Sequence, residues 1–265
     1  IYDTKTAEEL EQQYQKAMEE SGQMQEQMLS AYNTAVANAR LTQWRNRVIS
    51  DGYEPGSTFK LCTAVAALES GIITPTTTIR DQGVYTYYAY PQPKCWIYRQ
   101  YGSTHGSINV SQAITESCNY FFYETGRLTG IETIDNYATQ FGLGRSTGIE
   151  TGDSKGALAS PEYAKANELE WTDGQTITAA IGQSYNLFTP IQLANYVATL
   201  VGDGEHYKAH LLKNVKSYDN SSMIYAYDEG PENTVSISDS TLQAVKEGMY
   251  GVANSTLSSQ FSRCI

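Results

Sequence analysis

Helical spacing of apolar residues is the main pattern along the chain. Within residues 1–45 it follows a capping-box sequence at Thr6–Glu9, with Gly22 as the one weak point, and predicts one long amphipathic helix or a helical hairpin. The apolar positions of this segment are Leu10, Tyr14, Met18, Met28, Leu29, Tyr32 and Val36. Such a segment usually packs on its own domain, so we assign it no partner.

Further helices and a few strands are predicted in the rest of the chain. The same spacing indicates helices over residues 57–71, 110–123, 126–141, 190–200 and 238–250. Ser111 and Ser238 are plausible caps of two of them, and Pro190 suits the first turn of another. Residues 72–101, rich in Thr, Tyr, Pro and Gly, predict loops and short strands, and residues 207–218 and 223–227 read as strands.

The predicted helix after Pro55-Gly56 has a lysine in its first turn and almost no polar face before Gly71. Burying an ammonium is costly unless it is paired or loses its proton, so Lys60 is either a neutral base or a satisfied core charge. Ser57 lies three residues earlier on the same face, at the positive end of the helix dipole. The pair is typical of a serine nucleophile with a lysine base, although Ser-x-x-Lys also occurs by chance.

Length and charge narrow the class of protein. A chain of 265 residues with 40% hydrophobic residues can form one large globular domain, or a domain with an appendage. Its net charge of -11, with no stripe of basic residues, argues equally against nucleic acid and against an anionic membrane surface as partners. There is no run of about eighteen apolar residues and no signal-peptide pattern, so we expect any membrane anchor to lie upstream of Ile1.

The cysteines show no metal or disulfide signature. They lack zinc-finger and Cys-x-x-Cys spacing and are interpreted as small buried side chains: Cys62, Cys95, Cys118 and Cys264. Asp81, Cys95 and His105 are each good metal-ligand types, but their spacing matches no standard site. We therefore predict that these residues are structural and that no metal and no cofactor is bound.

Two motifs resemble those of the penicillin-binding proteins. Residues 53–60, Tyr-Glu-Pro-Gly-Ser-Thr-Phe-Lys, are similar to the family's active-site motif. Three Ser-x-Asn triplets begin at Ser107, Ser117 and Ser184, and the one at Ser117 stands where the family has its second motif. Residues 95–96, 101–106, 179–184 and 189–195 also resemble family phrases, although Ser184 stands where the family commonly has glycine.

On this resemblance the chain is identified as a member of the class B penicillin-binding proteins, closest to the elongation type called penicillin-binding protein 2. The resemblance implies an α+β transpeptidase fold of the serine β-lactamase type, with a dominant helical lobe and a central antiparallel sheet. It implies a D,D-transpeptidase that cross-links peptidoglycan stem peptides through a serine acyl-enzyme and is the target of β-lactam antibiotics. The implied partner is a membrane glycan polymerase of the elongation machinery, and the implied location is the extracytoplasmic face of the cell membrane.

The resemblance also assigns roles to individual residues. Ser57 would be the nucleophile and Lys60 its base. Ser117 would relay a proton between Lys60 and the leaving amine, and Asn119 would bind the substrate's peptide amide. The alternative for the Ser117 triplet is a pair of helix-capping residues.

The third family motif, Lys-Thr-Gly or a close variant, does not occur in the chain. Ser146-Thr147-Gly148 is only superficially similar, because it follows a predicted helix and Arg145 precedes it. We therefore expect an internal fragment in which both the opening and the closing strands of the sheet are cut off. Its predicted parts are an N-terminal helical segment, 1–45, and a partial transpeptidase domain, 46–265, and we expect the fragment to be inactive or impaired.

Three other functions stay open at this point. A serine β-lactamase or D,D-carboxypeptidase would share Ser57 and Lys60 but needs a positioned deacylating water, and no acid for that task can be assigned. A β-lactam sensor domain would be acylated without transfer. A non-catalytic scaffold would show no acylation at all.

Overall fold

The computed structural model describes residues 4–20, 25–90 and 92–255, and the chain divides into two compact units, 1–50 and 51–265. The helices of the first unit are α1 (Thr4–Glu20), α2 (Gln25–Trp44) and α3 (Arg47–Ser50). Tyr14 and Tyr32 stack with their ring centroids 4.9 Å apart, so α1 packs on α2. The sequence predicted either one long helix or a helical hairpin, and the structure has the hairpin. Thr6, where the sequence placed the start of the helix, lies inside α1. Gly22 and Cys264 lie outside the described residues.

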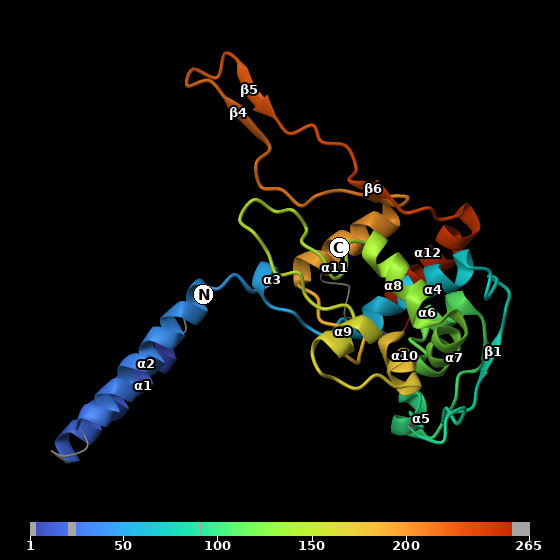
Figure 1. Cartoon of the computed structure of the whole chain (residues 1–265), viewed down its shortest axis with the longest axis horizontal. Coiled ribbons are helices and arrows are strands. Elements are labelled where there is room, and N and C mark those ends of the chain that lie inside the picture. The colour runs from blue at the N-terminus through green and yellow to red at the C-terminus, as the bar shows by residue number, and fades with distance from the viewer. Residues whose placement is uncertain (1–3, 21–24, 91, 256–265) are drawn as a thin grey trace. The chain divides into compact units, whose positions relative to one another are not determined.

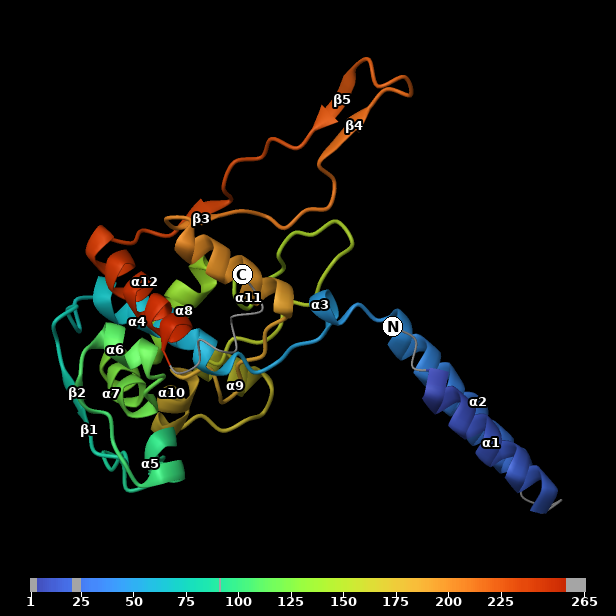
Figure 2. The ribbon, with the colours of Figure 1, turned by 180° about the vertical axis from the view of Figure 1, so that it is seen from behind.

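Helix α4 (Lys60–Glu69) is the centre of the second unit (Figures 1 and 2). It has almost no polar face, and every residue from Cys62 to Leu68 is buried. Around it pack α6 (Val110–Thr115), α7 (Asn119–Thr129), α8 (Ile131–Gln140) and α12 (Asp239–Asn254). A short 3-10 turn, η1 (Gly56–Phe59), leads into α4, and Gly71, with a φ of +71°, follows its C-terminus as predicted.

The predicted helix over residues 110–123 is in fact two helices, α6 and α7. Ser117 lies between them with a φ of +49°, a left-handed conformation that a continuous α-helix cannot contain. Asn109, and not Ser111, caps α6 through a capping box. The Ser111 side chain is instead buried and donates a hydrogen bond to the Ala244 carbonyl of α12. The break therefore gives the chain a sharp turn at the Ser-x-Asn triplet.

The other helices of the second unit are short, apart from α11. They are α5 (Trp96–Tyr101), α9 (Pro161–Ala166), α10 (Asp173–Ala179) and α11 (Pro190–Val201). Thr189 caps α11 with Gln192, and Pro190 occupies the first turn as predicted. α5 falls in a segment predicted as loops and strands. Among the described residues, no helix combines the length and the apolar character needed to cross a bilayer.

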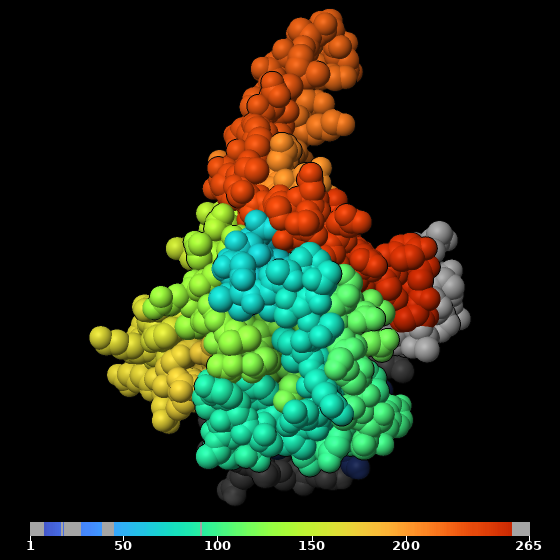
Figure 3. Space-filling view, turned by 90° about the vertical axis from the view of Figure 1, so that its right-hand side faces the viewer, coloured from blue at the N-terminus to red at the C-terminus, as the bar shows by residue number. Residues whose placement is uncertain are grey.

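The described strands form three two-stranded antiparallel ladders. The pairs are β1 (Ile79–Asp81) with β2 (Gly106–Ile108), β3 (Glu205–His206) with β6 (Asn233–Thr234), and β4 (Asn214–Lys216) with β5 (Met223–Ala226). β4 and β5 form an arm that projects from the helices (Figure 3), and all their residues are exposed. The fold is α+β with helices predominant, as predicted, and the described part of the chain contains no complete central sheet.

Candidate active site

Lys60, the first residue of α4, is 2% exposed and is bonded to the turn before α7. Its Nζ donates to the Ser117 carbonyl at 2.8 Å, to Ser117 Oγ at 3.1 Å and to Asn119 Oδ1 at 2.6 Å. Burial lowers the pKa of Lys60 to about 8, and the nearby thiols of Cys118 and Cys95 oppose that shift. A lysine in this setting is buried, fully hydrogen-bonded, and able to lose its proton near neutral pH.

Ser57 is an exposed residue of the η1 turn, and Ser117 connects it to Lys60. The Ser117 hydroxyl donates to Ser57 Oγ at 2.9 Å. Among the described residues no direct hydrogen bond joins Ser57 to Lys60, so Ser117 Oγ is the link between the two. This arrangement differs from the direct proton transfer that the Ser-x-x-Lys spacing suggested.

Close backbone packing holds the η1 turn in place. The backbone N–H of Gly56 donates to the Gly182 carbonyl at 2.9 Å, and the Tyr196 hydroxyl donates to the Thr58 carbonyl at 3.1 Å. Gly182 has a φ of +76°, and a Cβ there would lie 2.1 Å from the Gly56 oxygen. Only glycine fits this contact.

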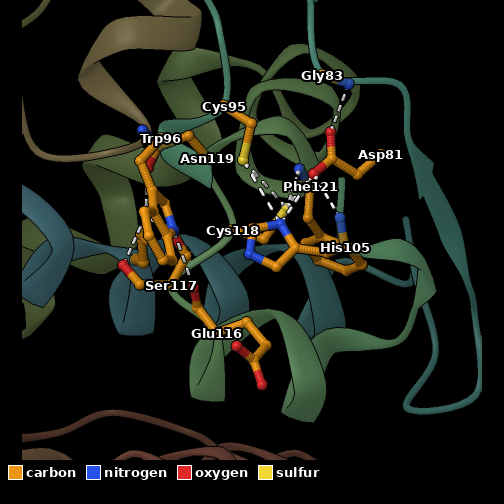
Figure 4. Close-up of polar contacts among 11 residues, drawn as sticks. Asp81, Gly83, Cys95, Trp96, His105, Glu116, Ser117, Cys118, Asn119 and Phe121 are labelled. Atoms are coloured by element: carbon orange, nitrogen blue, oxygen red, sulfur yellow. Dashed lines mark hydrogen bonds and ion pairs between the residues drawn. The ribbon is translucent and has the colours of Figure 1, made fainter. Parts of the chain in front are cut away.

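A strained turn presents Ser117. Its φ of +49° is uncommon for a residue with a side chain and costs of order 1 to 3 kcal/mol. The indole Nε1 of Trp96 donates to the Glu116 carbonyl at 3.0 Å (Figure 4). The Cys118 N–H donates to the Ala113 carbonyl at 2.9 Å. Trp96 was not predicted as a site residue, because its partner is a carbonyl 20 positions away that only the fold brings close.

The three Ser-x-Asn triplets differ in what their asparagines bind. Asn119, the first residue of α7, is bonded to Lys60. Asn109 caps α6, and Asn186 accepts from the backbone N–H of Ala159 inside a buried region. Among the described residues, the triplet at Ser117 is therefore the one in contact with Lys60.

Ser184, where the resembled family commonly has glycine, adopts a φ of +66°. Glycine adopts that conformation without cost, whereas serine does not. Its Oγ donates to Gln175 Oε1 at 3.1 Å, a contact that glycine could not make. The departure from the family pattern is thus a strained residue with one additional hydrogen bond.

Four side chains that could hold a metal ion converge beside the turn (Figure 4). They are Asp81 of β1, Cys95 at the N-cap of α5, His105 next to β2 and Cys118 at the N-cap of α7, and their ligand atoms lie within 4.8 Å of one another. Cys118 was not among the predicted candidates. Its neighbours are 13 to 37 residues away in the sequence, so no short spacing signals the group.

The geometry of this cluster fits tetrahedral zinc. With ordinary zinc bond lengths, the ligand atoms of such a site lie roughly 3.3 to 3.8 Å apart. Here Cys95 Sγ is 3.8 Å from Cys118 Sγ and 3.6 Å from His105 Nδ1, and Cys118 Sγ is 3.7 Å from Asp81 Oδ2. The His105 Nδ1 to Asp81 Oδ2 distance, 2.8 Å, is shorter, because these atoms are hydrogen-bonded, and all four ligand atoms lie within 4.8 Å of one another.

Protonation at the cluster also suits metal binding. The hydrogen bond from the Cys118 thiol lowers the pKa of Cys95 to about 6 and raises that of Cys118. Burial acts to raise the pKa of Asp81, but hydrogen bonds from the backbone N–H groups of His105 and Gly83 bring it below its ordinary value. Both shifts favour the deprotonated forms of Cys95 and Asp81, and these are the forms that bind metal.

Comparisons with known proteins agree with one another. The profile of the penicillin binding protein transpeptidase domain matches residues 1–262. The peptidoglycan D,D-transpeptidase MrdA of Salmonella typhimurium is 34% identical over 212 residues, covering 79% of this chain and 33% of the relative. The chain thus spans about a third of the length of that curated relative.

Solved structures give the same result. The crystal structure of Pseudomonas aeruginosa PBP2 in complex with WCK 5153 is similar with a TM-score of 0.71 and 28% identity, over 84% of this chain and 50% of that one. A chain in a peptidoglycan synthase complex that couples polymerization and crosslinking is similar with a TM-score of 0.68 and 27% identity, over 83% of this chain and 36% of that one.

Proposed function

The chain belongs to the penicillin-binding protein transpeptidase family, in its PBP2/MrdA-type class B branch, and from that premise we propose that it is the catalytic part of a peptidoglycan D,D-transpeptidase. One observation carries the proposal: the unbroken line of hydrogen bonds from Lys60 Nζ through Ser117 Oγ to Ser57 Oγ. A buried lysine and two serine hydroxyls in line are suited to moving a proton to and from a serine nucleophile.

In this mechanism neutral Lys60 accepts a proton from Ser117 while Ser117 accepts the proton of Ser57. The Ser57 oxygen attacks the carbonyl of the penultimate D-alanine of a stem peptide, and the tetrahedral intermediate collapses with loss of the terminal D-alanine. Lys60 then gives the proton back through Ser117, which passes it to the leaving amine. Asn119 binds the peptide amide of the donor, and the amine of a neighbouring stem peptide then takes the acyl group from Ser57.

The proposal includes the partners and the location of the whole protein. The substrates are peptidoglycan stem peptides, and β-lactam antibiotics acylate Ser57 as mimics of the donor. The partner is a membrane glycan polymerase of the elongation machinery, since a similar structure belongs to a synthase that couples polymerization and crosslinking. The site works at the extracytoplasmic face of the cell membrane, and residues 1–45 lead into the transpeptidase domain at 46–265.

The main alternatives are a β-lactam sensor and a serine carboxypeptidase or β-lactamase. The latter two must hydrolyse the acyl-enzyme and so need a group that activates water. Among the described residues, no carboxylate is hydrogen-bonded to Ser57, Lys60 or Ser117, which favours slow hydrolysis and transfer to an amine. Release of bound penicillin within seconds would favour the hydrolases, and acylation without any transfer to an amine would favour the sensor.

Substitution of Ser57 and Lys60 tests the mechanism. In the intact protein that carries this chain, we expect Ser57→Ala to abolish labelling by fluorescent penicillin and Lys60→Ala to slow it by about 10³-fold or more. Thermal melting checks that each variant is folded. Near wild-type labelling of a folded Lys60→Ala variant would contradict the role of Lys60.

We also propose, in place of the sequence-based expectation that no metal is bound, that Asp81, Cys95, His105 and Cys118 hold a structural zinc ion. The ion would tie the N-cap of α7 to β1 and α5, and so stabilise the turn that carries Ser117. Elemental analysis should find about one zinc per chain, lost in Cys118→Ala but kept in Cys62→Ala, whose thiol is buried in α4 outside the cluster. Protein purified without any zinc, and with an unchanged melting temperature after chelation, would contradict the metal site.

A further inference from the structure

Two of the four side chains in the metal cluster are cysteines whose sulfurs are in contact. Cys95 Sγ and Cys118 Sγ lie 3.8 Å apart, and both residues are fully buried (Figure 4). A disulfide bond is about 2 Å long, so the sulfurs need to approach by roughly 2 Å to be joined. Cys62, the third cysteine in the described part of the chain, contributes no atom to this cluster.

We propose that Cys95 and Cys118 are an oxidation site, which a peroxide converts to a disulfide when the cluster holds no metal and which a bound zinc ion protects. The proposal rests on the metal site proposed above. Zinc would engage both sulfurs and keep them about 3.8 Å apart, as the ligands of a tetrahedral site. Without the ion, two sulfurs in van der Waals contact remain, which is the arrangement of a reactive cysteine beside a resolving one.

The oxidation proceeds in two balanced steps. The Cys95 thiolate attacks one oxygen of hydrogen peroxide, the O–O bond breaks, hydroxide leaves, and Cys95 becomes a sulfenic acid. The Cys118 thiol then attacks Cys95 Sγ, the S–S bond forms and the S–O bond breaks. The hydroxyl leaves with the Cys118 proton as water. The cysteine pair thereby loses two electrons, and the peroxide gains them.

The position of Cys118 connects this chemistry to acylation. Cys118 lies between Ser117 and Asn119, and its sulfur accepts a hydrogen bond from the Phe121 N–H at 3.4 Å as the N-cap of α7. A disulfide would draw that sulfur toward Cys95 and away from the cap. The neighbouring side chains bond Lys60 at 2.6 to 3.1 Å, so even a small shift of the turn would break the line to Ser57.

The test compares zinc-loaded and chelated samples of the intact protein, each with and without hydrogen peroxide. In the chelated sample we expect peroxide to reduce the mass by about 2 Da, to yield a linked peptide containing Cys95 and Cys118, and to slow penicillin labelling at least about tenfold. Dithiothreitol should restore the labelling. The zinc-loaded sample should change in none of these measurements.

Matched variants separate this effect from general damage. Cys62→Ala should respond to peroxide as the unsubstituted protein does. Cys95→Asp retains a metal donor but cannot form a disulfide, so peroxide should leave its own labelling rate unchanged. If Cys95→Asp fails to fold, Cys95→Ser serves for the mass measurement, where no linked peptide should form.

Three results would overturn the proposal: no linked peptide after chelation and peroxide, a link that forms equally fast with zinc bound, or a link that leaves labelling unaffected. Failure of the proposed transpeptidase would look different, because the reduced, zinc-loaded protein would then not label with penicillin before any oxidant is added.

Discussion

At the scale of single residues, Lys60 is the position where burial and hydrogen bonding act in opposite directions. Burial disfavours the ammonium, whereas three oxygen acceptors around Nζ match its three N–H bonds. Burial is the larger effect and lowers the pKa of Lys60 to about 8, and the nearby thiols of Cys118 and Cys95 oppose this fall. The lysine is therefore mostly charged at neutral pH, with a fraction ready to act as a base.

This shift predicts the pH dependence of acylation. Only neutral Lys60 accepts a proton, so penicillin labelling should accelerate about 50-fold between pH 6 and pH 8 and then level off. Second-order labelling rates measured across pH 6 to 9 provide the check. Lys60→Arg is the control, because its guanidinium stays protonated over this range and should give almost no labelling. A flat profile would exclude Lys60 as the base.

The lowered pKa of Lys60 also reduces the free energy of unfolding at neutral pH. The pKa of Lys60 is lower in the folded protein than in the unfolded chain. At pH values below about 8 the lysine is protonated in both states, and the buried ammonium then costs the folded state about 3 kcal/mol. The cost disappears as pH rises from about 8 to above 10.5, where both states are neutral. Lys60 thus reduces the stability of the folded protein at neutral pH.

Some residues of the site could be identified from the sequence and others could not. Ser57, Lys60, Ser117 and Asn119 belong to motifs with fixed short spacing, and the structure brings all four into contact. Trp96 and Cys118 act on this group through partners far away in the sequence. Their roles give no local signal, since a buried cysteine and an exposed tryptophan are both ordinary in a folded protein.

At the scale of secondary-structure elements, helices with an apolar face were predictable and breaks between helices were not. α4, α11 and α12 lie where the apolar spacing placed them, and α8 forms only the part of the predicted helix 126–141 that follows Gly130, because residues 126–129 belong to α7. The break between α6 and α7 was missed because the apolar spacing runs on across it. What interrupts the helix is the left-handed residue Ser117, held by tertiary hydrogen bonds that no helix propensity reflects.

The contact between α7 and α10 gives a prediction at this scale. Gly126 of α7 lies so close to α10 that a Cβ would be 2.3 Å from the Ala180 Cβ. Gly126→Val should therefore lower the free energy of unfolding by about 2 to 3 kcal/mol through overpacking. Leu128→Val on the exposed side of α7 is the control and should change it by less than about 1 kcal/mol. Equal denaturant midpoints for the two variants would show that α7 and α10 are not packed this tightly.

At the scale of the whole molecule, the chain consists of two compact units, and the hydrogen-bonded residues of the candidate site belong to the second. All the hydrogen-bonded site residues lie in the unit 51–265, and the unit 1–50 contributes none of them. A net charge of -11 is compatible with a peptide-processing enzyme and gives no support for a nucleic-acid partner. Catalysis and the helical hairpin should therefore be separable.

Replacing residues 4–44 by a flexible Gly/Ser linker in the intact protein tests this separation. The penicillin-labelling rate should stay within about twofold of the original, because the line from Lys60 to Ser57 is built entirely from the second unit. A control with the same linker and Lys60→Ala should not label. A loss of more than about tenfold on linker replacement would show that the hairpin acts on the site.

The line from Lys60 to Ser57 has one more consequence, for anyone who prepares this protein. Its central atom, Ser117 Oγ, comes from a position 57 residues beyond Lys60 and 60 beyond Ser57, on the turn before a different helix. A chain with α4 and α7 formed but not docked would have normal helical circular dichroism and no working nucleophile. Penicillin labelling would therefore measure the fraction of correctly folded molecules. In a refolding experiment it would report the moment of tertiary docking, which helix content alone does not reveal.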